Sequence, residues 1–225
     1  MDRAARTQFP DRPRHRARAP ARPAVLTLTG AVIAGGAATR YGGAPKGLVT
    51  VGGRRVIDRV VDALTAATGK PPILVANDPA AAEWRPDLTV HRDVVPGMGS
   101  LGGILTAVET AGSALCVAWD MPFVPAPLLG ALATLLEGAD VAIPESDSRR
   151  GLEPLCAAYG PACGPAIRAA LARGDQRAIA FHADVRVARL GRERVLQYGD
   201  PDVLFFNVNS PSDLERAESL CRVPG

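Results

Sequence analysis

Short apolar runs alternate with longer amphipathic segments through most of this 225-residue chain, and that alternation limits the folds it can adopt. Continuous apolar runs bounded by turn residues are typical of buried strands. The longer segments carry apolar residues at every third or fourth position, which is typical of helices that cover a core. Strands that alternate with such helices form parallel sheets. We therefore expect a single-domain α/β fold with three layers, α/β/α, around a mostly parallel sheet.

The positions of these runs predict the individual strands and helices. A stripe of apolar residues from Val56 to Leu64, with charged residues opposite, marks the first helix. The last helix has a clear start, because Ser210 can cap it, Pro211 suits its first turn and Asp213 lies near the positive end of its dipole. The predicted strands are residues 26–33, 72–76, 88–91, 115–118, 139–143 and 155–159, and the predicted helices are residues 56–64, 101–110, 127–136, 162–172 and 210–221.

The first 23 residues differ in composition from the rest of the chain. They hold seven of the 26 basic residues and two of the 23 acidic ones, so the pI of about 8.9 reflects this segment. Rich in arginine and proline and poor in apolar side chains, residues 1–23 are predicted to be a disordered tail ahead of a domain at 24–225. Arginine clusters can contact polyanions. We favour a tail without function, because no fold would aim these arginines at a ligand.

Cysteine and hydropathy patterns exclude several classes of protein. The four cysteines form no C-x-x-C pair and no nearby histidine pattern, so neither a zinc site nor a disulfide framework is indicated. No stretch is long and apolar enough to span a bilayer, and the first residues lack the apolar core of a signal peptide. We therefore expect a soluble, cytoplasmic protein with neither a membrane nor a nucleic acid as its partner.

A glycine-rich loop follows the first predicted strand and ends in one of the chain's two lysines. Gly35 and Gly36 stand after the strand, a second glycine pair follows, and Arg40 and Lys46 add positive charge. Glycines at the carboxyl end of a strand expose backbone N–H groups to an anion. The loop lacks the Ser or Thr that follows the lysine of a Walker A loop. We favour a polyphosphate site over the alternative, a glycine-rich surface loop without a ligand.

Asp120 follows the apolar strand at residues 115–118, at the edge where open α/β sheets bind their ligands. A carboxylate there suits Mg²⁺, which uses one or two protein carboxylates and takes its other ligands from phosphate and water. The alternative is an acid at the start of the next helix. Asn77 and Asp93 also follow predicted strands, and each could equally be a turn residue.

Asn207 and Asn209 alternate with Val208 just before the last helix. In an extended segment, residues two apart face the same way, so both amides could reach one ligand. A turn that leads into the capped helix explains the same residues equally well.

A second glycine cluster, at residues 97–102, matches the pattern G-x-G-x-x-G of dinucleotide-binding enzymes. In those enzymes the pattern occupies the first strand-to-helix turn, whereas here three predicted strands precede it and the first turn carries the cationic loop. The pattern keeps an NAD(P)-dependent oxidoreductase as the alternative from another class of enzyme, but its position in the chain disfavours that reading.

Five motifs in order resemble those of the molybdenum cofactor guanylyltransferases, a family of the nucleotidyltransferase superfamily with a Rossmann-like fold. They are A-G-G-x-x-x-R-x-G-G-x-x-K-G-L at 34–48, P-G-M-G-S-L-G-G-I at 96–104, W-D-M-P-F-V at 119–124, E-P-L-C-A-A-Y at 153–159 and F-N-V-N-S-P-S-D-L at 206–214. The chain departs from the family where Pro45 replaces a frequent acid and Tyr41 a frequent Met. A proline there is common among cytidylyl- and sugar-nucleotidyltransferases, so a cytidylyltransferase acting on molybdopterin or a sugar phosphate is a second alternative.

The resemblance implies transfer of GMP from GTP to the phosphate of molybdopterin, with release of pyrophosphate and with Mg²⁺ as cofactor. By this resemblance the partners of the protein are these two substrates, and transient contacts with molybdoenzymes or cofactor-handling proteins are compatible with it. The resemblance also implies site residues: Lys46, Arg40 and Asp120 in catalysis; Ile33, Ala34, Gly35, Gly36, Lys46, Asn77, Asp93, Gly99 and Asp120 in nucleotide binding; Asp120 on the metal; and Asn207 and Asn209 on the acceptor side.

Overall fold

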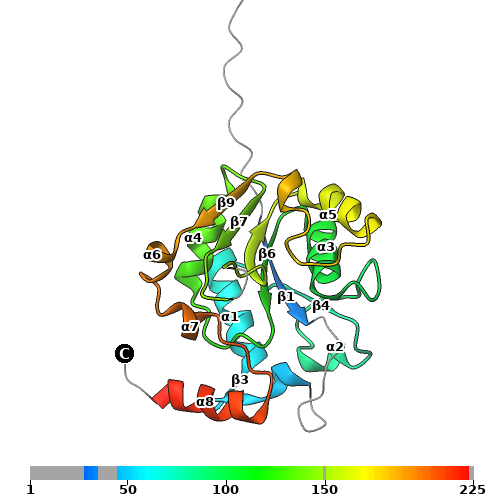
Figure 1. Ribbon diagram of the computed structural model, residues 1–225. Helices are drawn as coiled ribbons and strands as arrows, with labels where there is room; N and C mark the ends of the chain where they lie inside the picture. The colour runs from blue at the N-terminus through cyan, green and yellow to red at the C-terminus, as the bar shows by residue number, and fades with distance from the viewer. Residues whose placement is uncertain (1–27, 35–44, 149–150, 223–225) are drawn as a thin grey trace, which may run out of the picture.

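The computed structural model describes residues 28–34, 45–148 and 151–222, and these residues form a seven-stranded sheet in the order β5-β4-β1-β6-β8-β7-β9 (Figure 1). All neighbouring pairs are parallel except the two that involve β8, which runs antiparallel to β6 and β7. The expected α/β fold with a mostly parallel sheet is therefore confirmed. The strands are β1 (Thr29–Ala34), β4 (Ile73–Ala76), β5 (Val90–His91), β6 (Ala114–Ala118), β7 (Val141–Pro144), β8 (Cys156–Tyr159) and β9 (Val187–Leu190).

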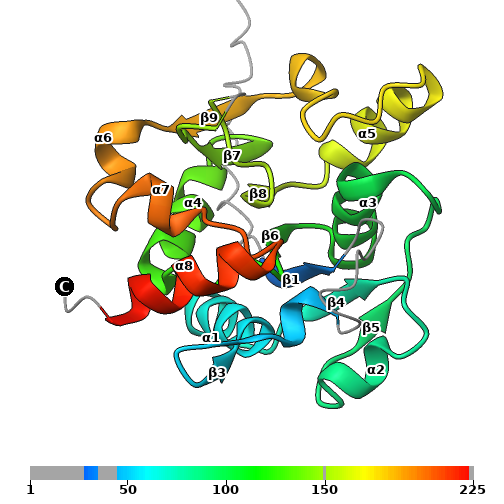
Figure 2. The ribbon, with the colours of Figure 1, turned by 60° about the horizontal axis from the view of Figure 1, so that its bottom comes forward.

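Helices cover both faces of the sheet, as the alternation of apolar runs predicts (Figures 1 and 2). Successive strand residues point to opposite faces, so Val32 belongs to the core cluster that includes residues of α1 and α4, whereas Ile33 belongs to the cluster that includes residues of α3 and α5. Both side chains are buried, which explains why the strand reads as a continuous apolar run. The covering helices are α1 (Val56–Thr68), α3 (Gly99–Ala111), α4 (Ala126–Leu136) and α5 (Cys163–Ala172).

Several short elements have no counterpart among the sequence predictions. The strand β9 was missed because its residues V-A-R-L are mostly half-buried or exposed and form no apolar run. The others are too short for a periodic pattern: η1 (Lys46–Leu48), β2 (Thr50–Val51), β3 (Arg54–Arg55), α2 (Ala81–Trp84), η2 (His182–Asp184), α6 (Arg192–Val195) and α7 (Pro201–Leu204).

The predicted last helix is confirmed as α8 (Pro211–Arg222), and its cap forms as expected, since the backbone N–H of Asp213 donates to Ser210 Oγ at 3.2 Å. The strand expected at 88–91 is shorter, because the N–H of Leu88 donates to the Arg85 carbonyl in a turn rather than to a strand. The tail at 1–23 lies outside the described residues. No helix within the described ranges is both long and apolar enough to cross a membrane.

The reversed strand β8 matters most for the site. In the pairing of β6 with β8, Cys156 at the start of β8 lies opposite Val117 near the end of β6. The segment that precedes β8 therefore reaches the same edge of the sheet as the carboxyl ends of the parallel strands. As a result, Glu153 is brought towards the edge that carries Asp120.

Candidate active site

Lys46 begins the short helix η1, and close packing fixes the position of that helix. The next residue, Gly47, lies against the indole of Trp119, and a Cβ on it would stand 2.4 Å from Trp119 Cε3. Trp119 is 5% exposed and stacks on Trp84 with ring centroids 4.8 Å apart. Because Trp119 directly precedes Asp120, this contact holds Lys46 close to the end of β6.

Asp120 stands just past β6 and is anchored through its backbone. Its carbonyl accepts a hydrogen bond of 2.9 Å from the N–H of Val208, and the N–H of the preceding Trp119 donates to the Ile33 carbonyl at 3.2 Å. Burial raises the pKa of the Asp120 carboxyl, and the positive charge of Lys46 opposes that rise only in part. Within the described residues Asp120 forms no ion pair, and a cation bound beside it would favour its charged form.

The two asparagines before α8 precede and follow the buried Val208 in the chain. Asn209 accepts a hydrogen bond of 2.7 Å from Lys46 Nζ through its Oδ1, and its own N–H donates to Asp213 Oδ2 at 3.0 Å. The Asn207 side chain donates to the Phe205 carbonyl at 2.9 Å. The structure therefore brings Asn209 to Lys46 and anchors Asn207 beside it.

Asn77 and Asp93 form a pair across the ends of β4 and β5. Asn77 Nδ2 donates to Asp93 Oδ2 at 2.7 Å, and Asn77 Oδ1 accepts from the Asp93 N–H at 2.9 Å. Asp93 is 9% exposed, and its Oδ1 is buried without a hydrogen-bond partner in the described part of the chain. The pair lies beside the start of α3, since a Cβ on Gly102 would stand 3.6 Å from Asp93 Oδ2.

The remaining predicted site residues fall into three groups. Gly99 begins α3 with a φ of +58°, a conformation that a side chain would disfavour. The side chains of Ile33 and Ala34 are buried in the core, so only their backbone atoms could contact a ligand. Gly35, Gly36 and Arg40 lie outside the described residues.

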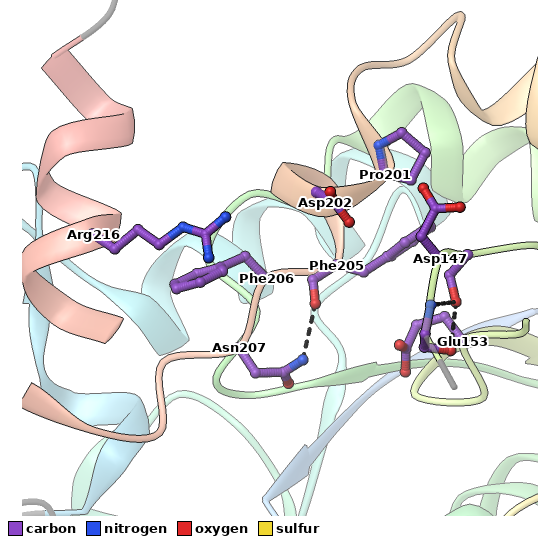
Figure 3. Close-up of a pocket in the computed structure, with 10 residues that line it drawn as sticks. Asp147, Glu153, Pro201, Asp202, Phe205, Phe206, Asn207 and Arg216 are labelled. Carbon is purple, nitrogen blue, oxygen red and sulfur yellow. Dashed lines mark hydrogen bonds between the residues drawn. The ribbon is translucent and has the colours of Figure 1, made fainter. Parts of the chain in front are cut away.

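Sequence reasoning missed a pocket of about 370 Å³ beside Asn207, which we call the Glu153 pocket (Figure 3). Burial raises the pKa of Glu153 to about 7, and the negative charge of Asp120 adds to the rise. Glu153 opens the motif at 153–159, but it precedes a strand rather than following one, so its position in the sequence did not mark it as a site residue. The pocket is lined by Ser146, Ser148 and Glu153 on one side and by Phe206, Asn207 and Arg216 on the other, among other residues.

The residues around Asp120 suit a hard cation held partly by a substrate. Asp120 offers carboxylate oxygens, and Asn207 can add its amide oxygen on the same edge, whereas the amide oxygen of Asn209 already accepts from Lys46. In the described ranges no three residues of the types His, Cys, Asp and Glu gather into a group that could hold a metal by themselves. Such an arrangement fits Mg²⁺, which commonly completes its coordination with substrate phosphates and water.

Comparisons with known proteins show the family of this chain. The family model described as "MobA-like NTP transferase domain" matches residues 30–187. A probable molybdenum cofactor guanylyltransferase of Pelotomaculum thermopropionicum is 35% identical over 198 residues, which cover 87% of this chain and 94% of the relative. The molybdenum cofactor guanylyltransferase of Cereibacter sphaeroides is 34% identical over 200 residues, covering 88% and 98%.

A solved structure of a related protein has the same fold. The molybdopterin-guanine dinucleotide biosynthesis protein A of Archaeoglobus fulgidus aligns with a TM-score of 0.72 and 29% identity, covering 86% of this chain and 98% of the other. Fold, site and comparisons define an enzyme that is a nucleotidyltransferase. Within that class, the chain belongs to the MobA-like NTP transferase family of molybdenum cofactor biosynthesis, which confirms the resemblance found in the sequence and sets aside the oxidoreductase alternative.

Proposed function

We propose that this enzyme transfers GMP from GTP to the phosphate of molybdopterin, forming the guanine dinucleotide cofactor and releasing pyrophosphate, with Mg²⁺ as cofactor. The observation that carries the proposal is the junction of three segments at one edge of the sheet. Lys46 Nζ lies 2.7 Å from Asn209 Oδ1, and the N–H of Val208 ties the same asparagine segment to Asp120 at 2.9 Å. The similarity to proteins named molybdenum cofactor guanylyltransferase supports transfer of a guanylyl group.

The Asn77–Asp93 pair supports guanine as the base. Guanine carries two adjacent donors, its N1–H and its 2-amino group, and a carboxylate accepts such a pair well. Cytosine places the acceptor N3 beside its single amino group, so the same carboxylate would repel one of its atoms. The buried Oδ1 of Asp93 has no partner within the described residues and is suited to accept from guanine.

The chemistry needs alignment and charge rather than a protein nucleophile. An oxygen of the acceptor phosphate attacks the α-phosphorus of GTP, the bond to the β-phosphate oxygen breaks, and pyrophosphate leaves with the electron pair. The attacking phosphate is already an anion, so no side chain has to remove a proton. Lys46, held by Asn209, brings positive charge to the phosphates, and Asp120, just past the end of β6, would hold the cation that helps to orient them. Mg²⁺, when bound by Asp120, would neutralise charge on the phosphates.

The first experiment is a thermal-shift panel with GTP, CTP and NAD, each with Mg²⁺, followed by a pyrophosphate-release assay with the stabilising nucleotide and molybdopterin. A ligand that binds only the folded state raises the melting temperature by mass action. We expect GTP to give the largest shift and to support pyrophosphate release. Stabilisation by CTP instead would favour the cytidylyltransferase, and absence of pyrophosphate release with Mg²⁺, GTP and molybdopterin would overturn the proposal.

A further inference from the structure

The Glu153 pocket combines polar and aromatic walls in a space large enough for a fused two-ring heterocycle. Its volume of about 370 Å³ lies within the range of small-molecule sites. In Figure 3, Glu153 and Asn207 lie at the lower part of the pocket, while Arg216 from α8 reaches over Phe206. The Arg216 guanidinium carbon is 5.0 Å from the centre of the Phe206 ring. The pocket therefore offers hydrogen-bonding groups at its base and flat apolar surface at its side.

Asp147 and Asp202 of this pocket are exposed, whereas Glu153 is its half-buried carboxyl group, and the hydrogen-bonding capacity of Glu153 is little used. Its carboxyl accepts one long hydrogen bond, from the N–H of Leu155 to Oε1 at 3.4 Å, and it forms no ion pair within the described residues. Ser148, by contrast, donates to the Leu152 carbonyl at 3.1 Å and accepts from Ser146 at 2.8 Å. A mostly buried carboxyl group without a protein partner is costly unless a ligand supplies donors.

The pocket also lies next to the sheet edge at which the phosphate of the acceptor would react, so the rest of the acceptor could extend into it. Asn207, on its wall, is next to Val208, whose N–H bonds the Asp120 carbonyl, so the pocket opens beside the edge where phosphates would meet. Glu153 and Ser148 also line a neighbouring cavity of about 380 Å³ that includes Ser100 from the first turn of α3. Glu153 thus stands between the nucleotide side of the site and the pocket.

We propose that the Glu153 pocket binds the ring of the acceptor and that the Glu153 carboxylate accepts hydrogen bonds from its 2-amino group and N3–H. This inference rests on the proposed function, because it takes the acceptor to be a pterin. A pterin presents these two donors side by side on one edge, which matches the two oxygens of a carboxylate. Glu153 would thereby distinguish a pterin from a ring of the same shape that has a carbonyl at that edge.

The test compares two fluorescent ring systems, pterin and lumazine, as ligands of the full-length protein in the presence of GTP and Mg²⁺. Lumazine has a carbonyl oxygen where pterin has the 2-amino group. The Glu153 carboxylate would therefore accept only the N3–H hydrogen bond from lumazine, and its other oxygen would face the repelling carbonyl oxygen. We expect wild type to bind pterin at least about tenfold more tightly than lumazine, since buried polar groups discriminate strongly against a missing donor. Equal affinities in wild type would overturn the proposal.

The variant Glu153→Gln keeps the shape of the side chain but replaces one accepting oxygen with a donor. We expect its preference for pterin to fall to about twofold or less, and its acceptor KM to rise at least about tenfold while its affinity for GTP stays within about twofold of wild type. The matched control is Glu137→Gln, the same change at an exposed position after α4, which should keep the full preference. An unchanged preference in Glu153→Gln would overturn the proposal, and if that variant fails to fold, the two ligands on wild type still decide it.

The two proposals fail in distinguishable ways. If wild type prefers pterin through Glu153 but releases no pyrophosphate with GTP and molybdopterin, the proposed reaction is wrong and the ring site stands. If wild type catalyses the reaction and Glu153→Gln keeps both its preference and its acceptor KM, the reaction stands and the ring site is wrong.

Discussion

Two regions of the same sheet edge are organised in opposite ways. At the ends of the parallel strands, the polar side chains are held by one another: Asn77 pairs with Asp93 through two hydrogen bonds, and Lys46 is held by Asn209. In the Glu153 pocket, beside the antiparallel strand β8, the carboxyl has only one long hydrogen bond, of 3.4 Å. In the first region the side chains are oriented before a substrate binds, and the Asp93 Oδ1 is left open, whereas in the second region a whole carboxyl is left nearly unpaired for a neutral ring.

The largest expected effect tests the strand-end region. We expect Lys46→Ala and Asp120→Asn each to lower kcat at least tenfold, and on the order of 100-fold, because each removes charge stabilisation from the transition state. The measurement is steady-state pyrophosphate release at saturating GTP. A melting temperature close to that of wild type is the control for folding, and near-normal turnover in either variant would contradict its role.

Gly47→Ala tests whether packing positions Lys46. The new Cβ would stand 2.4 Å from the Trp119 ring, so we expect the free energy of unfolding to fall by about 2 kcal/mol. The matched control is Gly130→Ala in α4, where a Cβ meets nothing within 4 Å, and that variant should be more stable by about 0.5–1 kcal/mol. Urea unfolding measures both, and equal stabilities of the two variants would show that the contact with Trp119 is unimportant.

Asn77→Ala breaks the pairing at the ends of β4 and β5. It removes two hydrogen bonds from Asp93, which is nearly buried, so we expect GTP affinity to fall about tenfold as the carboxyl loses its orientation. Isothermal titration calorimetry with GTP and Mg²⁺ measures the dissociation constant of GTP for both proteins. An unchanged affinity would mean that the orientation of Asp93 does not depend on Asn77.

Glu153→Gln tests whether the Glu153 carboxyl makes the stability of the protein depend on pH. Because burial raises the pKa of Glu153 from 4.5 to about 7, this carboxyl contributes stability that is fully present below pH 4.5 and is lost as the pH rises through 7. The variant should therefore gain stability relative to wild type between pH 5 and pH 8, by about 1 kcal/mol after allowance for partial exposure. Urea unfolding of both proteins in buffer without metal or nucleotide measures this, and parallel pH profiles would contradict it.

The smallest effect is expected from deletion of residues 1–23. These residues lie outside the described part of the structure, and the sequence predicts a tail without function. Turnover and GTP affinity should stay within about twofold of the full chain. A large loss of either would instead indicate that the arginines of the tail bind the substrates.

Residues that follow parallel strands could be recognised from the sequence, because a parallel strand always brings its carboxyl end to the ligand-binding edge. Asp120, Asn77 and Asp93 were predicted as site residues from their places after strands, and Lys46 was predicted from its glycine-rich loop. The hydrogen bond between Lys46 and Asn209 could not be predicted, because it joins residues 163 positions apart.

The α/β architecture and the family follow from the amino-acid sequence, since apolar periodicity and ordered motifs are local properties of the chain. The antiparallel direction of β8 became visible only in the fold, because the direction of a strand depends on its pairing and not on its residues. That reversal brings Glu153, which precedes its strand, to the edge where Asp120 follows its own. A pocket assembled from three segments distant in the sequence therefore became visible only in the fold.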